Sequence, residues 1–149
     1  KVIGWDRSRW YATAVTYPQN AVRGPIVMVT NQWAGSDGDI VGAATQAMGY
    51  AKVIGERSWG GVVGIDGRFD LVDGTGVTQP RYAGWYGDYG WGVENHGVDP
   101  DIVVTVSPED WESASDVQLD AAIAECLRQL DEKSAATPPE LPGPAFGRC

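Results

Sequence analysis

Short apolar runs alternate with polar turns along the chain, and the spacing of their apolar residues changes from run to run. The Pro, Asn and Gly cluster of residues 17–25 predicts a loop. "PIVMVTN", residues 25–31, is continuous and β-branched, as is typical of a buried parallel strand. After the turn at residues 32–39, apolar residues recur at helical spacing until Gly49. "AKVIGE", residues 51–56, predicts a second strand, so the order is that of a right-handed βαβ unit.

The second half of the chain predicts a ribbon, another strand and a helix. Between residues 60 and 93, glycines and aromatic residues alternate with short β-like runs, as in hairpins. "PDIVVTV", residues 100–106, predicts a further buried strand, and the "SPEDW" that follows offers a helix start. Residues 116–133 have the periodicity of an amphipathic helix. The tail is rich in Pro and Gly, so we expect residues 133–149 to be extended or mobile.

Composition is that of a globular chain of 149 residues, one domain or a piece of one. The 20 acidic and 11 basic residues give a formal charge of -9, which would repel phosphate backbones and anionic lipids. No run approaches the roughly 20 apolar residues of a membrane span. We therefore expect no nucleic acid and no membrane as partners. Two cysteines, Cys126 and Cys149, are too few for a disulfide framework and fit a cytoplasmic location.

The turn "AGSDG" places Ser36 between the predicted strand and the first turn of the helix. A hydroxyl there would be held at the sheet edge, and the backbone N–H of Asp37 would face the same space. These groups are a nucleophile and one donor of an oxyanion hole. A second interpretation is that Ser36 only caps the helix, because Ser and Asp are preferred caps. The nucleophile-elbow pattern G-x-S-x-G is also imperfect, since Ala34 occupies its first glycine position.

Four motifs in order carry a resemblance: "VRGPIVMVTNQWAGSDGDI", "KVIGERSWGGVVGI", "DGTGVTQP" and "GVENHGVDPDI". Together they resemble the C-terminal catalytic portion of the tricorn-type serine peptidases, which are related to the C-terminal processing peptidases. The resemblance implies an α/β fold with a crotonase-like or ClpP-like β-β-α core, of which residues 1–132 form the C-terminal part. The chain begins at Lys1, within what resembles a structured element, so we expect a fragment or a processed product.

The resemblance also implies an activity, the cleavage of peptides to short oligopeptides by acyl transfer. Ser36 is then the nucleophile and the Asp37 N–H an oxyanion donor. C-terminal processing peptidases carry a lysine base in the segment equivalent to "GERSWGG", where this chain has Gly60 and Gly61. The tricorn-type enzymes use a histidine flanked by a serine, upstream of this chain, and a glutamate, here Glu94. This Ser-His-Ser-Glu tetrad is incomplete in the chain, so we expect the fragment alone to be inactive.

Three side chains have more than one interpretation. Without the resemblance, Glu94 would be a solvated surface carboxylate. His96, the single histidine, would share a face with Glu94 on a strand, but such neighbours cannot easily place imidazole between serine and carboxylate. A surface or partly buried histidine is therefore preferred. By resemblance, Asp6 aligns, with a one-residue length difference, with an aspartate that reaches the S1 pocket of a neighbouring subunit and favours basic P1 residues. The alternative is an ordinary turn aspartate.

We expect no cofactor and no metal. The resemblance implies peptide substrates, the remainder of the catalytic domain, neighbouring subunits of a homo-oligomer, by resemblance a hexamer, and aminopeptidases acting downstream. The aromatic residues between 82 and 91 leave a different class of function open, because aromatic side chains among glycines can form a peptide- or sugar-binding face. The alternative is a non-catalytic peptide-binding or assembly domain that retains the peptidase fold.

Overall fold

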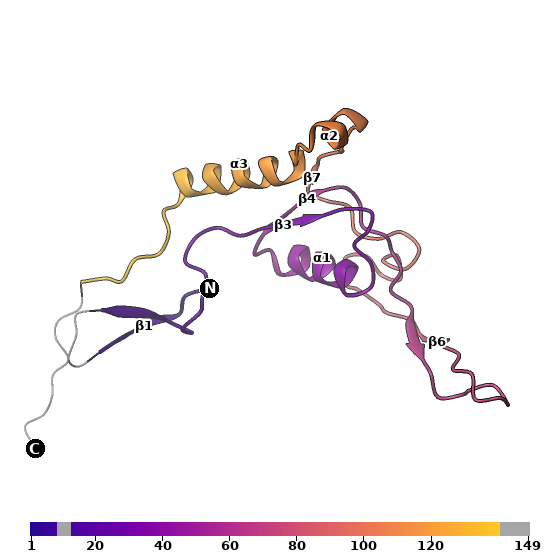
Figure 1. Ribbon diagram of the computed structural model, residues 1–149. Coiled ribbons are helices and arrows are strands. Elements are labelled where there is room, and N and C mark those ends of the chain that lie inside the picture. The colour runs from indigo at the N-terminus through magenta and orange to yellow at the C-terminus, as the bar shows by residue number, and fades with distance from the viewer. Residues whose placement is uncertain (9–12, 141–149) are drawn as a thin grey trace, which may run out of the picture. The chain divides into compact units, whose positions relative to one another are not determined.

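A computed structural model describes residues 1–8 and 13–140 and shows a mixed α/β chain (Figure 1). The chain divides into two compact units. The larger unit is residues 26–125, and the smaller one is formed by the chain on either side of it. Of the predicted tail, residues 134–140 contain no helix or strand and the last nine residues lie outside the described part of the chain. Its mobility therefore stays a prediction.

A βαβ unit organises the larger unit. β3 (Val27–Thr30) and β4 (Lys52–Gly55) pair in parallel over their full length, and α1 (Asp37–Met48) connects them. α1 contacts both strands and lies beside them in Figure 1. The helix ends because Gly49 takes a left-handed conformation and donates its N–H to the carbonyls of the last turn. The predicted strand, turn, helix and strand are thus confirmed, and Ser36 directly precedes α1.

The third strand is shorter and more exposed than the sequence predicts. β7 (Ile102–Val103) pairs in parallel with β4, which gives the strand order β3-β4-β7. The central strand β4 buries Val53 and Ile54 completely. Val103 is 72% exposed, so the prediction of a long buried strand over residues 100–106 is wrong. β7 is an edge strand, and a side chain there has strand neighbours on one side only.

Two antiparallel hairpins complete the strands. β5 (Gly64–Asp66) pairs with β6 (Gln79–Tyr82) through a register shift, within the region that predicted a ribbon. In the smaller unit, β1 (Gly4–Arg7) pairs with β2 (Ala14–Tyr17). No sequence pattern predicted this β1–β2 hairpin. Strands of four residues contain too few positions for a clear alternation of apolar and polar side chains.

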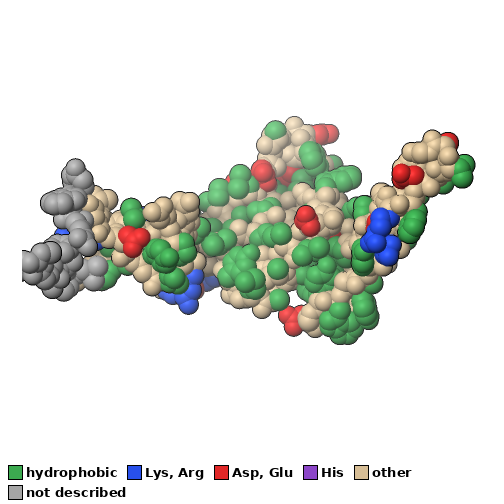
Figure 2. All heavy atoms as spheres, turned by 90° about the horizontal axis from the view of Figure 1, so that it is seen from below, with side chains coloured by type: hydrophobic (Ala, Val, Ile, Leu, Met, Phe, Trp, Pro, Cys, Tyr) green, Lys and Arg blue, Asp and Glu red, His purple; other side chains and the backbone are tan. Residues whose placement is uncertain are grey.

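Two helices follow β7. α2 (Pro108–Ser113) begins at the predicted "SPEDW" motif, and α3 (Val117–Glu132) matches the predicted amphipathic helix. Much of the apolar face of α3 is uncovered, with Leu119, Ile123 and Leu127 about half exposed. Figure 2 shows hydrophobic side chains at several places on the surface, among other residues. None of the helices in the described part of the chain has both the length and the hydropathy of a membrane span.

The core of the larger unit lies between α1 and two loops. It consists of the buried side chains of Ala43, Val62, Val93 and Val98. The aromatic rings of Tyr86 and Tyr89 pack against it. Val62 and Val93 are the sequence neighbours of Gly61 and Glu94. Packing of the core therefore holds in place the two loops that carry the candidate site residues.

Candidate active site

Ser36 occupies the turn between β3 and α1 with an exposed side chain and a strained backbone. Its φ of 53° and ψ of -114° lie where non-glycine residues are rarely found, at a cost of about 1–3 kcal/mol. The Ser36 N–H donates to the carbonyl oxygen of Gly61 at 3.1 Å, and the Ser36 carbonyl accepts from the N–H of Ile40 at 3.0 Å. These two hydrogen bonds hold the residue in its unusual conformation.

The hydroxyl of Ser36 does not cap the helix. It has no hydrogen-bond partner within the described part of the chain, so Ser36 is the N-cap residue by position but its side chain makes no capping hydrogen bond. The N–H of Asp37 is also free of acceptors among these residues, because the first amides of a helix have none within it. The next amide, that of Gly38, donates to the Gly35 carbonyl at 2.9 Å. One unpaired hydroxyl and one unpaired N–H thus belong to consecutive residues.

Glu94 is joined to Ser36 through a single peptide group. The carbonyl of that group belongs to Gly61 and accepts from Ser36, while its N–H belongs to Val62 and donates to Glu94 Oε2 at 2.8 Å. Two hydrogen bonds and one peptide group place the Ser36 nitrogen and this carboxylate oxygen no further apart than about 8.5 Å. The structure therefore brings the two predicted residues into one site, with the Glu94 carboxylate half-buried and oriented by a backbone donor.

The loops that carry Gly61 and Glu94 cross at two glycines. The Asn95 N–H donates to the Gly60 carbonyl at 2.8 Å. A Cβ atom on Gly60 would lie 2.5 Å from the nitrogen of Gly97, and both glycines have a positive φ, of 84° and 88°. Position 60 therefore has no room for a side chain.

Two residues near Ser36 were not predicted from the sequence. The Trp59 ring, 68% exposed, occupies the space where side chains on Gly35 and Gly61 would lie, so it covers the backbone on both sides of the Ser36 hydrogen bond. Asp39, two positions after Asp37, is completely buried. A signal for Asp39 was present, because a residue at this position shares a helix face with the buried Gly42 and Ala43.

His96 and Asp6 lie outside this cluster of contacts. The segment around His96 forms turns and is not a strand, and its Nε2 lies 2.7 Å from Asp99 Oδ2. Its Nδ1 is 3.4 Å from the guanidinium of Arg57, and no hydrogen bond joins the imidazole to Ser36 or Glu94. Asp6 is exposed on β1 of the smaller unit. Its role at a neighbouring subunit stays a prediction.

The aromatic residues between positions 82 and 91 are partly packed and partly exposed. Trp85 and Trp91 form an edge-to-face pair with ring centroids 5.3 Å apart, while both rings stay more than half exposed. Tyr86 and Tyr89 pack against the core. Packing against the core therefore accounts for two of the five aromatic residues between positions 82 and 91, while Tyr82, Trp85 and Trp91 stay more than half exposed.

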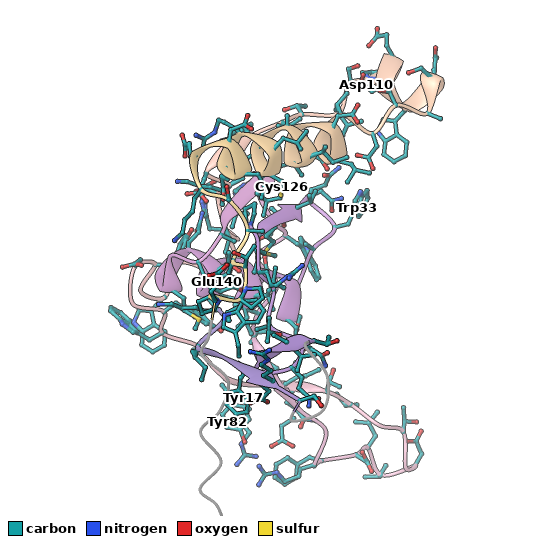
Figure 3. All side chains as sticks on the ribbon, turned by 90° about the vertical axis from the view of Figure 1, so that its left-hand side faces the viewer. Tyr17, Trp33, Tyr82, Asp110, Cys126 and Glu140 are labelled. Atoms are coloured by element: carbon teal, nitrogen blue, oxygen red, sulfur yellow. The ribbon has the colours of Figure 1, made fainter. Side chains whose placement is uncertain are left out.

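A cavity of about 420 Å³ lies at the carboxyl ends of β3 and β4. Its lining includes Trp33, Glu56 and Trp111 but neither Ser36 nor Glu94. Figure 3 shows the Trp33 side chain projecting past the end of β3. Within the described part of the chain, no group of three or more His, Cys, Asp or Glu side chains is arranged to hold a metal ion.

Comparisons with known proteins show the family of this chain. Residues 6–104 match the model of peptidase family S41. The chain is 56% identical over 142 residues to tricorn protease homolog 1 of Streptomyces coelicolor, and 48% identical over 130 residues to the tricorn protease of Thermoplasma acidophilum. These matches cover 95% and 87% of the chain but only 13% and 12% of the relatives. The chain thus spans a small fraction of their length.

Solved structures show the same relationship. The crystal structure of the tricorn protease matches with a TM-score of 0.82 at 48% identity, covering 88% of this chain and 13% of that one. A putative peptidase from Parabacteroides merdae matches with a TM-score of 0.56 at 23% identity, covering 74% of this chain and 34% of that one, and shows the fold alone. The predicted α/β fold and the predicted family are confirmed: the chain belongs to peptidase family S41, and its relatives there are the tricorn proteases.

Proposed function

We propose that this chain is the nucleophile-bearing part of a larger serine endopeptidase that degrades peptides to short oligopeptides. One observation carries the proposal. Among the residues that the structure describes, the exposed and strained Ser36 has an unpaired hydroxyl, adjoins the unpaired N–H of Asp37, and is joined through one peptide group to Glu94. Membership of peptidase family S41 supports the same reaction class.

In the proposed reaction, Ser36 Oγ attacks the carbonyl carbon of the scissile bond while its proton passes to a general base. The carbonyl oxygen becomes an oxyanion, and the Asp37 N–H donates a hydrogen bond to it from the positive end of α1. The tetrahedral intermediate then collapses, the amine leaves, and an ester remains on Ser36. Water hydrolyses this ester and frees the serine. Donors of this kind contribute about 2.7–4 kcal/mol to transition-state stabilisation.

The general base of this reaction is proposed to lie outside the chain, as the histidine of a Ser-His-Ser-Glu tetrad. The contacts of His96 support this assignment, because its two ring nitrogens face Asp99 and Arg57. Glu94 would orient the imidazole through the intervening serine hydroxyl and stabilise its charged form. The Val62 N–H fixes one Glu94 oxygen and leaves the other for that contact.

Specificity and assembly belong to the whole protein. We propose peptide substrates with a basic P1 residue, selected by Asp6 of a neighbouring subunit, whose exposed carboxylate would attract a Lys or Arg side chain. The assembly is proposed to be a homo-oligomer, a hexamer, located in the cytoplasm. Its short products would pass to aminopeptidases.

Hydrolysis of fluorogenic peptides by the full-length polypeptide tests this function. Peptides with Arg and with Phe at P1 are compared for the wild type, Ser36→Ala and the control Ser113→Ala, which changes an exposed serine on α2. We expect Ser36→Ala to lower turnover by about 1,000-fold or more and the control to leave it unchanged. Absence of turnover by a folded wild-type protein, or equal turnover by Ser36→Ala, would favour a non-catalytic peptide-binding domain.

A further inference from the structure

Asp39 is a carboxylate with no exposed surface, three residues after Ser36 in the first turn of α1. Burial of a charged group is unfavourable unless its oxygens are hydrogen-bonded. Asp39 Oδ1 accepts from the Ser58 hydroxyl and from the Gly60 N–H at 2.8 Å, and Oδ2 accepts from the Gly61 N–H at 3.2 Å. The positive end of α1 adds to the stabilisation of the charge.

All three donors belong to one segment, residues 58–61, which we name the tether loop. The tether loop ends at the peptide group that contacts both predicted site residues: the Gly61 carbonyl accepts from Ser36, and the adjoining N–H donates to Glu94. Asp39 therefore sets the position of the one peptide group that lies between the nucleophile and the carboxylate.

Ser58 links the hydrogen bonds of Asp39 to the loop that contains Val98. Its hydroxyl donates to Asp39 and accepts from the N–H of Val98 at 2.8 Å, and Val98 is a fully buried core residue. The backbone N–H of Ser58 donates to the Val98 carbonyl at 3.1 Å. Through Ser58, the carboxylate of Asp39 is thus tied to the core as well as to the tether loop.

The hydrogen bonds of Asp39 help to keep Ser36 in its strained conformation. A residue with a φ of 53° keeps that conformation only if its surroundings impose it, and one of the two backbone bonds that do so ends on Gly61. A neutral amide cannot replace the carboxylate, because three donors converge on its two oxygens and an amide presents N–H groups on one side. The Asn side chain would leave the Gly61 N–H unpaired or repel it.

We propose that Asp39 is a positioning residue, whose buried carboxylate fixes the tether loop and thereby aligns the Ser36 hydroxyl, the Asp37 N–H and the Glu94 carboxylate. The proposal rests on the proposed function, since the groups it aligns are those of the proposed reaction. Asp39 touches none of the reacting atoms. Its effect is on the rate at which a bound acyl or phosphonyl group is attacked, and binding itself is unaffected.

Fluorophosphonate modification of the full-length polypeptide tests the proposal, with the apparent affinity and the maximal modification rate measured separately. We expect Asp39→Asn to lower the maximal rate by about 10- to 100-fold, because misplacement of reacting groups by about 1 Å costs that much, and to leave the apparent affinity unchanged. Thr45→Val is the matched control. Thr45 is equally buried on α1, but its hydroxyl contacts Tyr50 and Met28, both outside the tether loop.

Ser58→Ala provides an independent variant if Asp39→Asn fails to fold, since it removes one of the three donors and spares the carboxylate. A smaller fall in the maximal rate is expected. The positioning role would be overturned if Ser58→Ala and folded Asp39→Asn both kept the wild-type maximal rate, or if Thr45→Val lowered that rate as much as Asp39→Asn does. In either case, modification of Ser36 in the wild type would still support the proposed function. A folded wild type that is not modified would overturn both.

Discussion

Ser36 combines a free hydroxyl, an exposed side chain and a positive φ. The sequence "AGSDG" could predict the turn, the helix start and the candidate nucleophile, because Gly, Ser and Asp have strong local preferences. It could not predict the strain, since nothing local forces a serine into that conformation. The Gly61 carbonyl that helps to hold it comes from 25 residues further along the chain.

Two variants that both lack the Ser36 hydroxyl can measure the backbone strain at this position separately from the reactivity of the hydroxyl. Glycine adopts a positive φ without cost, so Ser36→Gly should stabilise the start of α1 by about 1 kcal/mol relative to Ser36→Ala, although neither variant can be phosphonylated. Native-state hydrogen exchange of the α1 amides measures the difference. Ala114→Gly, at a φ of 54° after α2, should stabilise its own helix and leave modification of Ser36 intact. Equal protection in both Ser36 variants would argue against strain.

Glu94 should act through its charge. In Glu94→Gln the side-chain oxygen can still accept from the Val62 N–H at the observed 2.8 Å, so the loop should keep its structure. Peptide turnover should fall by about 10-fold or more, because a neutral amide stabilises a charged imidazole less. Glu112→Gln, an exposed change on α2, is the control. Full activity of Glu94→Gln would contradict a catalytic role for this carboxylate.

At the scale of elements, the strongly patterned segments could be predicted and the weak ones could not. The patterns of apolar residues in β3, α1, β4 and α3 are long or continuous, and the structure has these elements where the patterns predict them. β7 is only two residues long: β4 ends at Gly55, the partner of Val103, and before Ile54 the Val53 N–H donates to the side chain of Asp101. The role of Asp39 could not be predicted, because it depends on hydrogen bonds with the tether loop, about 20 residues away in sequence.

The start of α2 should give a pH-dependent stability. Hydrogen bonds from the Ser107 hydroxyl, then from its backbone N–H, hold the pKa of Asp110 below its ordinary value of 3.8. A lowered pKa means that the stabilisation is present above 3.8 and lost as the pH falls through the lower folded-state value. The difference in α2 hydrogen exchange between the wild type and Asp110→Asn should therefore be present at pH 7 and shrink toward pH 3. A difference that persists or grows at pH 3 would contradict this assignment.

At the scale of the molecule, this chain is about an eighth of the length of the relatives it matches. Its larger unit has five tryptophans more than half exposed: Trp33, Trp59, Trp85, Trp91 and Trp111. The described residues contain no histidine placed to serve Ser36, because the single histidine of the sequence pairs with Asp99. The fold could be predicted from this chain, but the complete catalytic set could not, since part of it is proposed to lie on other segments.

The isolated 149-residue chain should therefore lack peptidase activity. Loss of the general base, which is proposed to lie outside the chain, should alone cost orders of magnitude, so turnover should fall at least about 10,000-fold below that of the full-length polypeptide. Circular dichroism establishes whether the isolated chain is folded before the assay. Robust turnover that survives repurification would show that the chain carries its own base.

The most direct test of the central claim is to locate a covalent adduct. The folded full-length polypeptide is treated with a fluorophosphonate, digested and analysed by tandem mass spectrometry. The proposed mechanism predicts a single phosphonylated residue in this chain, Ser36, and no adduct on the chain after Ser36→Ala. Modification of a different serine, or none on a protein that hydrolyses peptides, would contradict the assignment of Ser36 as the nucleophile.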